Sequence, residues 1–528
     1  MKQKILKHLP FILLILGTLT YIIYFSLFSI NRYEKNYSHY FDLGIMNQAA
    51  YNSYQAVKTG DMGRMLEITD PHAATRQVKR MAVHNDPFLA LAGMFYFIHE
   101  GPATLLVLQA VVVALGALIV YALTCAVLNN NHHSAWLGML LGYTYLFYPP
   151  LQRAVAFDFH AITLSVTFIL AWYYFFIRKR YIISSFFFLL ALTTKENVPL
   201  STGFFSALLL LQEMKNRPAL YSIKQPLNML KNVFMHRKNR YLLLWGMLSV
   251  VWLVVTMAVI IPRAEGGSHF GSSYYSYILA RPWDVPFFAL RSNAREFVFS
   301  LLAPVSFLPL ISPFFALALV PDLLVKILST NENLINTYFH YDALLTGFIF
   351  IATVQGVKRI VADFPDMFAK FPQRINRIIQ VMNVHTMEKT AIDKRMLSVS
   401  VIVVIVTILC SIKYSALPFA RRPELHPFAP APAKYDDVIY WKNKLKSDSL
   451  IVSTTGSMAP FFTSRRMYLD FAMDYNVADY VVIDTWDAEH GFLKNDSKPA
   501  YDLIRIDPEF ERIYDNDGIE VYKRVKKS

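Results

Sequence analysis

Carboxylates, histidines and cations stand in short clusters beside long apolar stretches of the sequence. Carboxylates supply general bases, and Lys or Arg side chains bind phosphate groups. Together these residue types favour transfer chemistry on a phosphate-containing donor. The clusters are Asp42, His84 with Asp86, Arg153, Asp158 with His160, Lys195 with Glu196, Arg263, and His340 with Asp342.

The clusters of the first polar segment, 31–101, also have structural interpretations. Asp42 is either the cap of an interfacial helix, which the helical spacing of the apolar residues after it predicts, or a reactive carboxylate. Asp86 precedes Pro87 and suits the start of a second amphipathic helix. His84 is either part of that capped turn or a ligand or proton carrier.

Two later clusters pair an Asp with a His at a spacing of two residues. Asp158 and His160 either anchor a membrane interface among aromatic residues, or couple by a hydrogen bond or share a metal. His340 is either a core or interface histidine, or it faces the same cavity as Asp342.

The Lys195–Glu196 pair interrupts the apolar stretch 181–212, where unpaired charges are costly. The pair is either a structural ion pair that closes a hairpin, or a phosphate contact from Lys195 with a helper carboxylate from Glu196. The segment 262–295 contains Arg263 and a run rich in Gly, Ser and Tyr, typical of a flexible cover over an active site. It lacks the Gly-Lys-Ser/Thr of a phosphate-binding loop.

The elements that position these clusters follow from composition. Of the 528 residues, 55 % are hydrophobic and 17 % charged, whereas soluble domains carry about 25 % charge. The sequence therefore predicts a polytopic α-helical membrane protein with about nine to eleven transmembrane helices. The pairs of short apolar stretches at 181–212 and 296–328 each either cross the membrane twice or form one re-entrant hairpin. The apolar stretches are 8–30, 103–128, 134–150, 160–177, 181–194, 198–212, 241–261, 296–311, 313–328, 340–357 and 396–413.

Lys and Arg placement predicts the orientation in the plasma membrane. Basic residues concentrate at the N-terminus, at 178–180, and in the segments 213–240 and 358–395, which we assign to the cytoplasm. The polar clusters then fall at the outer ends of the spans. This placement explains the net charge of +14 and removes the case for nucleic-acid binding. We expect the segment 358–395 to form an amphipathic helix that lies on an anionic leaflet of the membrane.

We expect three regions along the chain. Residues 1–413 form the transmembrane domain, with a large first outer loop at 31–101 that carries interfacial helices. A Pro-rich linker follows at 414–433. Residues 434–528 form a small extracytoplasmic α/β domain that ends in a hairpin turning on Asn516-Asp517-Gly518.

The clusters belong to an ordered set of motifs that resembles the membrane family called domain of unknown function 2079. The resemblance covers nearly the whole chain. One departure is Asn47, where a second Asp or similar residue is expected beside Gln48. The motifs are Phe41-Asp42-Leu43-Gly44 with Gln48, His84-x-x-Pro87, Gln109, Phe157-Asp158-Phe159-His160, Lys195-Glu196-Asn197, Ile261-Pro262-Arg263, Pro321-Asp322-Leu323-Leu324 with Leu328-Ser329, Tyr338-x-His340-Tyr341, and the tail's 452–460 with Arg465-Arg466.

That family in turn resembles the C-type glycosyltransferases, which use a polyprenyl-phosphate sugar donor. The resemblance implies that Asp42 is the base and that Glu196, the second catalytic candidate, shapes the acceptor pocket or binds a metal together with His84, Asp158 and His160. It implies a wider substrate-binding set of phosphate contacts and pocket residues, some of which bind a divalent metal if one is used. That set is Gln48, His84, Asp86, Arg153, Asp158, His160, Lys195, Arg263, His340 and Asp342.

The resulting hypothesis is an inverting glycosyltransferase that moves a hexosyl or pentosyl group to an extracytoplasmic acceptor, such as a cell-envelope glycan, lipid or protein. The alternatives are a transporter or lipid flippase, and a non-catalytic envelope assembly protein. The sequence lacks GxSxG, HExxH and nucleotide-binding motifs, which argues against a serine hydrolase, a zincin or an ATP-driven pump. The one cofactor we consider is the divalent metal ion.

Overall fold

The computed structural model describes residues 2–71, 75–128, 132–216, 226–267, 269–362, 394–421, 430 and 432–525. Most of the predicted cytoplasmic segment 358–395, part of the segment 213–240 and part of the linker 414–433 lie outside these residues. The helix predicted on the anionic leaflet falls almost entirely in this undescribed part.

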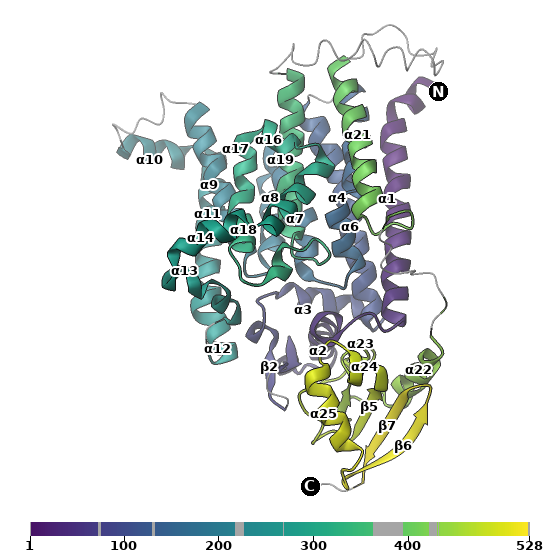
Figure 1. Cartoon of the computed structure of the whole chain (residues 1–528). Helices are drawn as coiled ribbons and strands as arrows, with labels where there is room; N and C mark the ends of the chain where they lie inside the picture. Colours follow the sequence, from purple (N-terminus) through teal and green to yellow (C-terminus); the bar gives the residue numbers. More distant parts are fainter. Residues whose placement is uncertain are drawn as a thin grey trace.

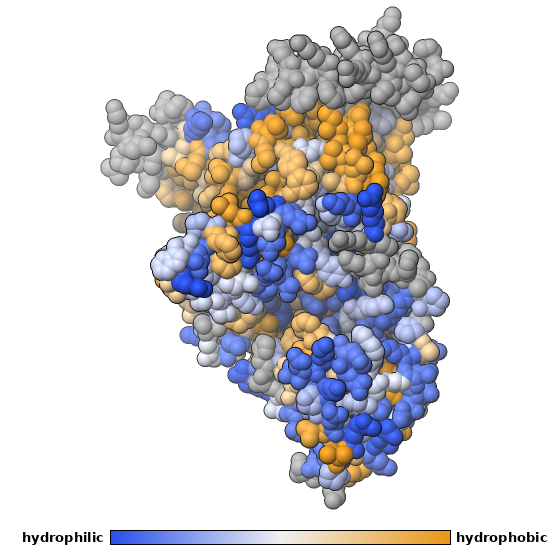
Figure 2. Space-filling view, in the orientation of Figure 1, coloured by the Kyte–Doolittle hydropathy of each residue, from blue (hydrophilic) through white to orange (hydrophobic). Residues whose placement is uncertain are grey.

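A body of apolar helices forms the half of the molecule that contains the N-terminus (Figure 1). In the described residues, four helical stretches are long and apolar enough to cross a membrane, and shorter apolar helices lie beside them. Figure 2 shows the apolar surface of this body as a band, with a polar surface toward the C-terminal domain. The main helices are α1 (Lys2–Glu34), α4 (Pro102–Val127), α5 (His132–Leu146), α7 (Ala161–Ile177), α8 (Tyr181–Leu192), α9 (Val198–Asn216), α11 (Arg237–Val255), α19 (Ala343–Ala362) and α21 (Lys394–Tyr414).

The core of this body forms where α4 and α7 pack against each other and against α5 and α19. A Cβ atom at Gly116 of α4 would lie 2.2 Å from the Tyr145 hydroxyl, so a small residue is needed at this crossing. Tyr145 is buried and donates a hydrogen bond to the Val113 carbonyl at 2.9 Å. The close approach therefore also satisfies a polar group inside the helical body.

The two ambiguous apolar segments fold differently. The segment 181–212 forms the two helices α8 and α9, joined by the turn 193–197. The segment 296–328 forms a chain of short helices, because proline repeatedly removes backbone donors and Ser306 and Phe307 adopt positive φ values of 54° and 56°. These helices are α15 (Ser292–Leu302), α16 (Leu308–Ile311), α17 (Pro313–Ala316) and α18 (Val320–Ile327).

The first polar loop lies between the helical body and the C-terminal domain (Figure 1). The two predicted amphipathic helices are present as α2 (Ile45–Thr59), preceded by one turn of wider helix η1 (Tyr40–Gly44), and α3 (Phe88–Gly93). A small antiparallel hairpin, which we did not predict, joins them through β1 (Glu67–Thr69) and β2 (Gln77–Lys79).

The C-terminal residues form the predicted small α/β domain. Its sheet has the strand order β4-β3-β5-β7-β6, with β4, β3 and β5 parallel and the other pairs antiparallel. The final hairpin turns at Asp517 and Gly518, whose φ values are 47° and 79°. The elements are α22 (Lys434–Lys444), β3 (Val452–Thr454), α23 (Ala459–Phe462), β4 (Tyr468–Asp470), β5 (Tyr480–Asp484), α24 (Thr485–His490), α25 (Lys494–Ile504), β6 (Phe510–Asn516) and β7 (Ile519–Arg524).

Buried polar contacts fix this domain to the first polar loop. Asn47 of α2 donates to the Thr463 hydroxyl at 2.9 Å, and Gln48 donates to the Arg466 carbonyl at 3.0 Å. Both amide side chains are fully buried. Since a buried amide that loses its partner is costly, these contacts hold the domain in one position over the loop.

Candidate active site

A cavity of about 320 Å³ lies where the first polar loop meets the ends of the apolar helices. Its wall brings together polar residues from stretches that lie far apart in the sequence. Six of the site residues predicted from the sequence line it: Asp42, His84, Asp86, His160, Lys195 and His340.

Asp42 presents a partly exposed carboxylate to this cavity. It lies within the first helical turn, the cap position is His39, and no side chain caps the turn by a hydrogen bond. Asp42 Oδ1 lies 3.3 Å from Nε2 of His160, with exposed fractions of 28 % and 6 % for the two side chains. The carboxylate is therefore oriented by a buried imidazole while it remains open to the cavity.

His160 is itself held by a second imidazole. Its ring stacks on that of His340 with centroids 3.4 Å apart and planes 13° from parallel. Burial, together with the neighbouring His160, lowers the pKa of His340 well below its ordinary value. His340 is therefore neutral near pH 7, and it packs against His160 without adding a positive charge.

Asp158 lies behind the cavity and is buried. Its Oδ1 accepts a hydrogen bond from the Ser38 hydroxyl at 2.6 Å, and burial raises the pKa of Asp158 to about 7 despite the nearby Arg32. Gln109 fixes the turn, donating to the Asp158 carbonyl at 3.1 Å and accepting from the His160 backbone N–H at 2.9 Å. Asp158 therefore supports the position of His160 from behind.

The raised pKa of Asp158 makes a prediction about stability. Its ordinary pKa is 3.8, so between about pH 4 and pH 7 the native state holds a proton that the unfolded chain has released. Stability therefore falls as the pH rises through this range. We expect the Tm of the wild type to fall more between roughly pH 5 and pH 8 than that of Asp158→Asn, which cannot titrate here. Parallel Tm curves for the two proteins would contradict the assignment.

A second cavity, of about 520 Å³, adjoins the first. Its wall is mostly apolar and includes Leu200 of α9, Leu253 of α11 and Met257 from the continuation of α11. His84, Ile162, Lys195, Phe270, Tyr274 and Tyr341 line both cavities. The cavity that contains Asp42 and the more apolar second cavity thus meet at Lys195.

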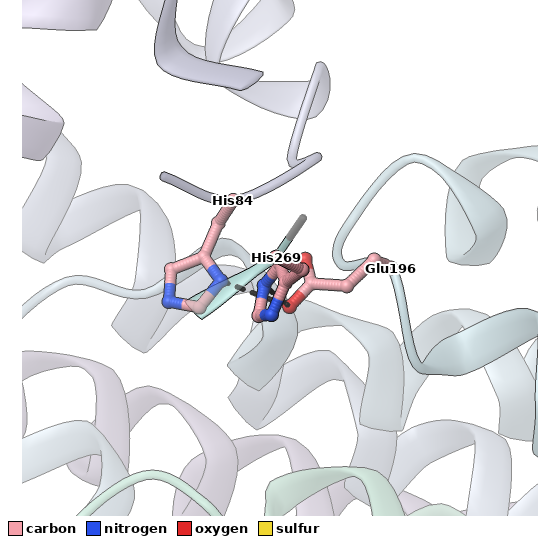
Figure 3. A group of neighbouring side chains, drawn as sticks. All are labelled: His84, Glu196 and His269. Carbon is pink, nitrogen blue, oxygen red and sulfur yellow. Dashed lines mark hydrogen bonds and ion pairs between the residues drawn. The ribbon is translucent and has the colours of Figure 1, made fainter. Parts of the chain in front are cut away.

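The charges at this junction are unevenly paired. Glu196 accepts a hydrogen bond from His84 Nδ1 at 2.8 Å (Figure 3). It also accepts one from the Asn85 backbone N–H at 3.1 Å. Burial disfavours the ionised carboxyl, but His84, His269 and Lys195 together hold the pKa of Glu196 well below its ordinary value. Burial, with Lys195 nearby, lowers the pKa of His84 to about 3.

Lys195 has no carboxylate oxygen within 4.0 Å among the described residues. Its Nζ lies 5.7 Å from the centroid of the Tyr341 ring. Burial lowers the pKa of Lys195, while Glu196 and Asp86 oppose that shift. A half-buried ammonium group without an ion pair is a strong candidate to bind an anionic ligand.

Besides Asp158, four residues predicted for substrate binding lie outside the two cavities. Gln48 joins α2 to the C-terminal domain, and Arg263 is exposed on α12 (Ile261–Glu265). Arg153 donates from Nε to the Tyr414 carbonyl at 2.9 Å and lines a separate polar cavity of about 720 Å³. Asp342 is fully buried, and burial raises its pKa well above the ordinary value.

The family comparison covers nearly the whole chain. The model for predicted membrane proteins of the DUF2079 family matches residues 32–521. The chain belongs to the DUF2079 family. The prediction of a multi-pass membrane protein of this family is therefore confirmed. No protein of curated function matches the sequence.

Solved membrane-protein structures share a distant likeness with this DUF2079 chain. One is the archaeal oligosaccharyltransferase AglB from Archaeoglobus fulgidus, solved in complex with an inhibitory peptide and a dolichol-phosphate. Its sequence is 10 % identical to this chain, and the TM-score is 0.43. The match covers 96 % of this chain and 74 % of AglB. ArnT from Cupriavidus metallidurans, bound to undecaprenyl phosphate, is 9 % identical with a TM-score of 0.45, covering 97 % of both chains. At these scores the likeness does not establish an activity.

The DUF2079 chain also contributes site residues that were not predicted. Phe270 and Tyr274 line both cavities and come from the segment that we expected to cover the site, but His269 beside them was not singled out. Arg80 lines the first cavity and Lys326 the second, where Lys326 forms a buried ion pair with Asp322. His269, Phe270 and Tyr274 share one local signal, their place in the predicted covering segment, whereas Arg80 and Lys326 had no such signal.

Proposed function

We propose that this chain is a membrane glycosyltransferase that moves a sugar from a polyprenyl-phosphate donor to an acceptor on the outer side of the membrane. The observation that carries the proposal is the ammonium of Lys195, which has no ion pair among the described residues and lies where the larger, more apolar cavity meets the cavity that contains Asp42. An amphiphile with a phosphate between a hydrocarbon chain and a polar group has its parts in the same order as the apolar cavity, Lys195 and the cavity of Asp42.

Each part of such a donor has a complementary surface. The wall formed by Leu200, Leu253 and Met257 suits an isoprenoid chain, because burial of apolar surface is favourable there. Lys195 offers the phosphate a charge-assisted contact. The sugar then lies in the smaller cavity, beside the carboxylate of Asp42.

The proposed reaction is a single displacement at the anomeric carbon. A hydroxyl or amine of the acceptor loses its proton to Asp42 as its oxygen or nitrogen forms the new bond to that carbon. The bond from the anomeric carbon to the phosphate oxygen breaks on the opposite face, which inverts the configuration. The lipid phosphate leaves with the electron pair, and Lys195 stabilises the added negative charge.

Binding of undecaprenyl phosphate tests the lipid part of the proposal. We expect Lys195→Met to weaken binding by about 30-fold or more, because a buried charge pair that loses one member costs about 2–5 kcal/mol. Lys195→Arg should retain most of the affinity, since it keeps the positive charge. The measurement is titration of the full chain in detergent with undecaprenyl phosphate, and with undecaprenol as the uncharged probe.

Lys58→Met is the matched control, because Lys58 is an exposed lysine on the same polar loop. It should bind undecaprenyl phosphate as the wild type does. Mass spectrometry of lipids that co-purify with the chain then identifies the sugar. Equal binding of undecaprenol and undecaprenyl phosphate would contradict the proposed phosphate contact, and solute flux in proteoliposomes without any glycan product would favour a transporter.

A further inference from the structure

Three potential metal ligands converge at the edge of the apolar cavity. His84 follows the hairpin of the first loop, Glu196 lies in the turn between α8 and α9, and His269 lies in the segment after α12. One ligand atom from each lies within 4.8 Å of the other two. Figure 3 shows both imidazole rings directed at the Glu196 carboxylate.

The distances suit a small ion. Nδ1 of His84 lies 2.8 Å and Nε2 of His269 lies 3.7 Å from Oε1 of Glu196. Around a tetrahedral zinc ion, with bonds of about 2.0–2.2 Å, ligand atoms are about 3.3–3.5 Å apart. The two distances to Glu196 differ from this spacing by about half an ångström, and the two imidazole nitrogens, which lie within 4.8 Å of each other, would approach by up to about 1.5 Å, within the reach of side-chain rotation.

Hydrogen bonding does not explain the buried position of the His269 Nε2 atom. Its Nε2 is buried and has no hydrogen-bond partner among the described residues. The 3.7 Å separation from Glu196 is too long for a hydrogen bond. A buried nitrogen directed at a carboxylate without reaching it leaves space for a third species between them.

We propose that His84, Glu196 and His269 bind one divalent transition-metal ion of the zinc class. Two imidazole nitrogens and one carboxylate oxygen favour zinc over magnesium or calcium, which prefer oxygen ligands. All three residues also line the 520 Å³ cavity, so the fourth coordination position opens into it. Water or an anionic oxygen of a ligand can occupy that position.

Metal binding has a local structural consequence. Nδ1 of His269 accepts a hydrogen bond from the Gly271 backbone N–H at 3.0 Å. When Nε2 binds the ion, the imidazole proton moves to Nδ1, which can no longer accept this bond. The turn at 269–271 must therefore rearrange, and the ion ties the covering segment to the turn 193–197.

The test is metal binding by the full chain, purified without a polyhistidine tag and stripped with a chelator. We expect one equivalent of zinc to bind, measured by competition with a chromogenic chelator and by elemental analysis. His84→Ala, Glu196→Gln and His269→Ala should each weaken binding by at least about tenfold, because even loss of a residue that supports a ligand costs about that much. His99→Ala, a change at an exposed histidine of the same loop, should leave binding unchanged.

A ligand exchange separates loss of the site from failure to fold. His269→Cys should still bind the metal, and its cobalt form should gain a sulfur-to-metal charge-transfer band that the wild type lacks. Hydrogen exchange at 269–275 should change when zinc is added to the wild type and not when it is added to Glu196→Gln. Zinc affinity that is the same in the wild type and the three ligand variants, or cobalt-loaded His269→Cys without the new band, would overturn the assignment. None of these readouts depends on the proposed sugar transfer.

Discussion

Asp42→Asn is expected to reduce sugar transfer by about 10²–10⁴-fold, the usual contribution of a positioned general base. The amide keeps the size and polarity of the side chain but cannot take a proton from the acceptor. Because Asp42 is only partly buried and caps no helix, the change should leave the fold intact. The measurement is product formation with the sugar-bearing lipid that co-purifies with the chain.

Two comparisons make this result specific to the base. Undecaprenyl phosphate should bind Asp42→Asn about as tightly as the wild type, since the phosphate contact comes from Lys195. Asp61→Asn is the control, because it changes an exposed carboxylate of the same polar loop, and it should retain full transfer. Wild-type turnover by Asp42→Asn would remove Asp42 from the mechanism.

Hydropathy was sufficient to predict the helical membrane body, but not the chain of short helices into which the apolar segment 296–328 folds. Apolar stretches must become helices in lipid because every backbone group has to be paired within the segment. The α/β tail was also predictable, since its short alternating elements and its Asp517–Gly518 turn are local signals. The helix α24 was missed, although Asp484 caps it by accepting bonds from the Trp486 and Asp487 backbone N–H groups.

The clustering of six predicted residues around one cavity follows from the same physics. Ionisable groups near lipid are retained where they share a polar environment, so separate clusters at one end of the spans tend to meet. The sequence near a polar residue does not show which residue will become its hydrogen-bond or ion-pair partner. Gln48 pairs with the C-terminal domain, more than 400 residues away in sequence, and no pattern near α2 indicates that contact.

Asp86 illustrates the same limit at short range. Its position before Pro87 favoured a helix cap, but the structure shows no side-chain cap at α3. Its carboxylate instead accepts hydrogen bonds from Arg80 Nε at 3.0 Å and Nη2 at 2.9 Å. The competing interaction prevails because a charge-assisted pair with a guanidinium is stronger than a hydrogen bond to a backbone N–H.

Arg80→Met is therefore expected to destabilise the protein by about 3–5 kcal/mol, because it leaves the Asp86 carboxylate buried without its counter-ion. Arg80 and Asp86 have exposed side-chain fractions of only 2 % and 5 %. Burial raises the pKa of Asp86, and Arg80 opposes that shift. The measurement is the free energy of unfolding by denaturant titration in mixed micelles.

Two further variants separate the buried pair from a general effect of losing an arginine. Arg281→Met removes an exposed pair with Asp284, with side-chain fractions of 64 % and 28 %, and should cost about 0–1 kcal/mol. The double variant Arg80→Met with Asp86→Leu should recover much of the loss, because no uncompensated charge then remains. If Arg80→Met cost no more than Arg281→Met, water would have to reach Asp86, and the wall of the Asp42 cavity would be more open than its packing indicates.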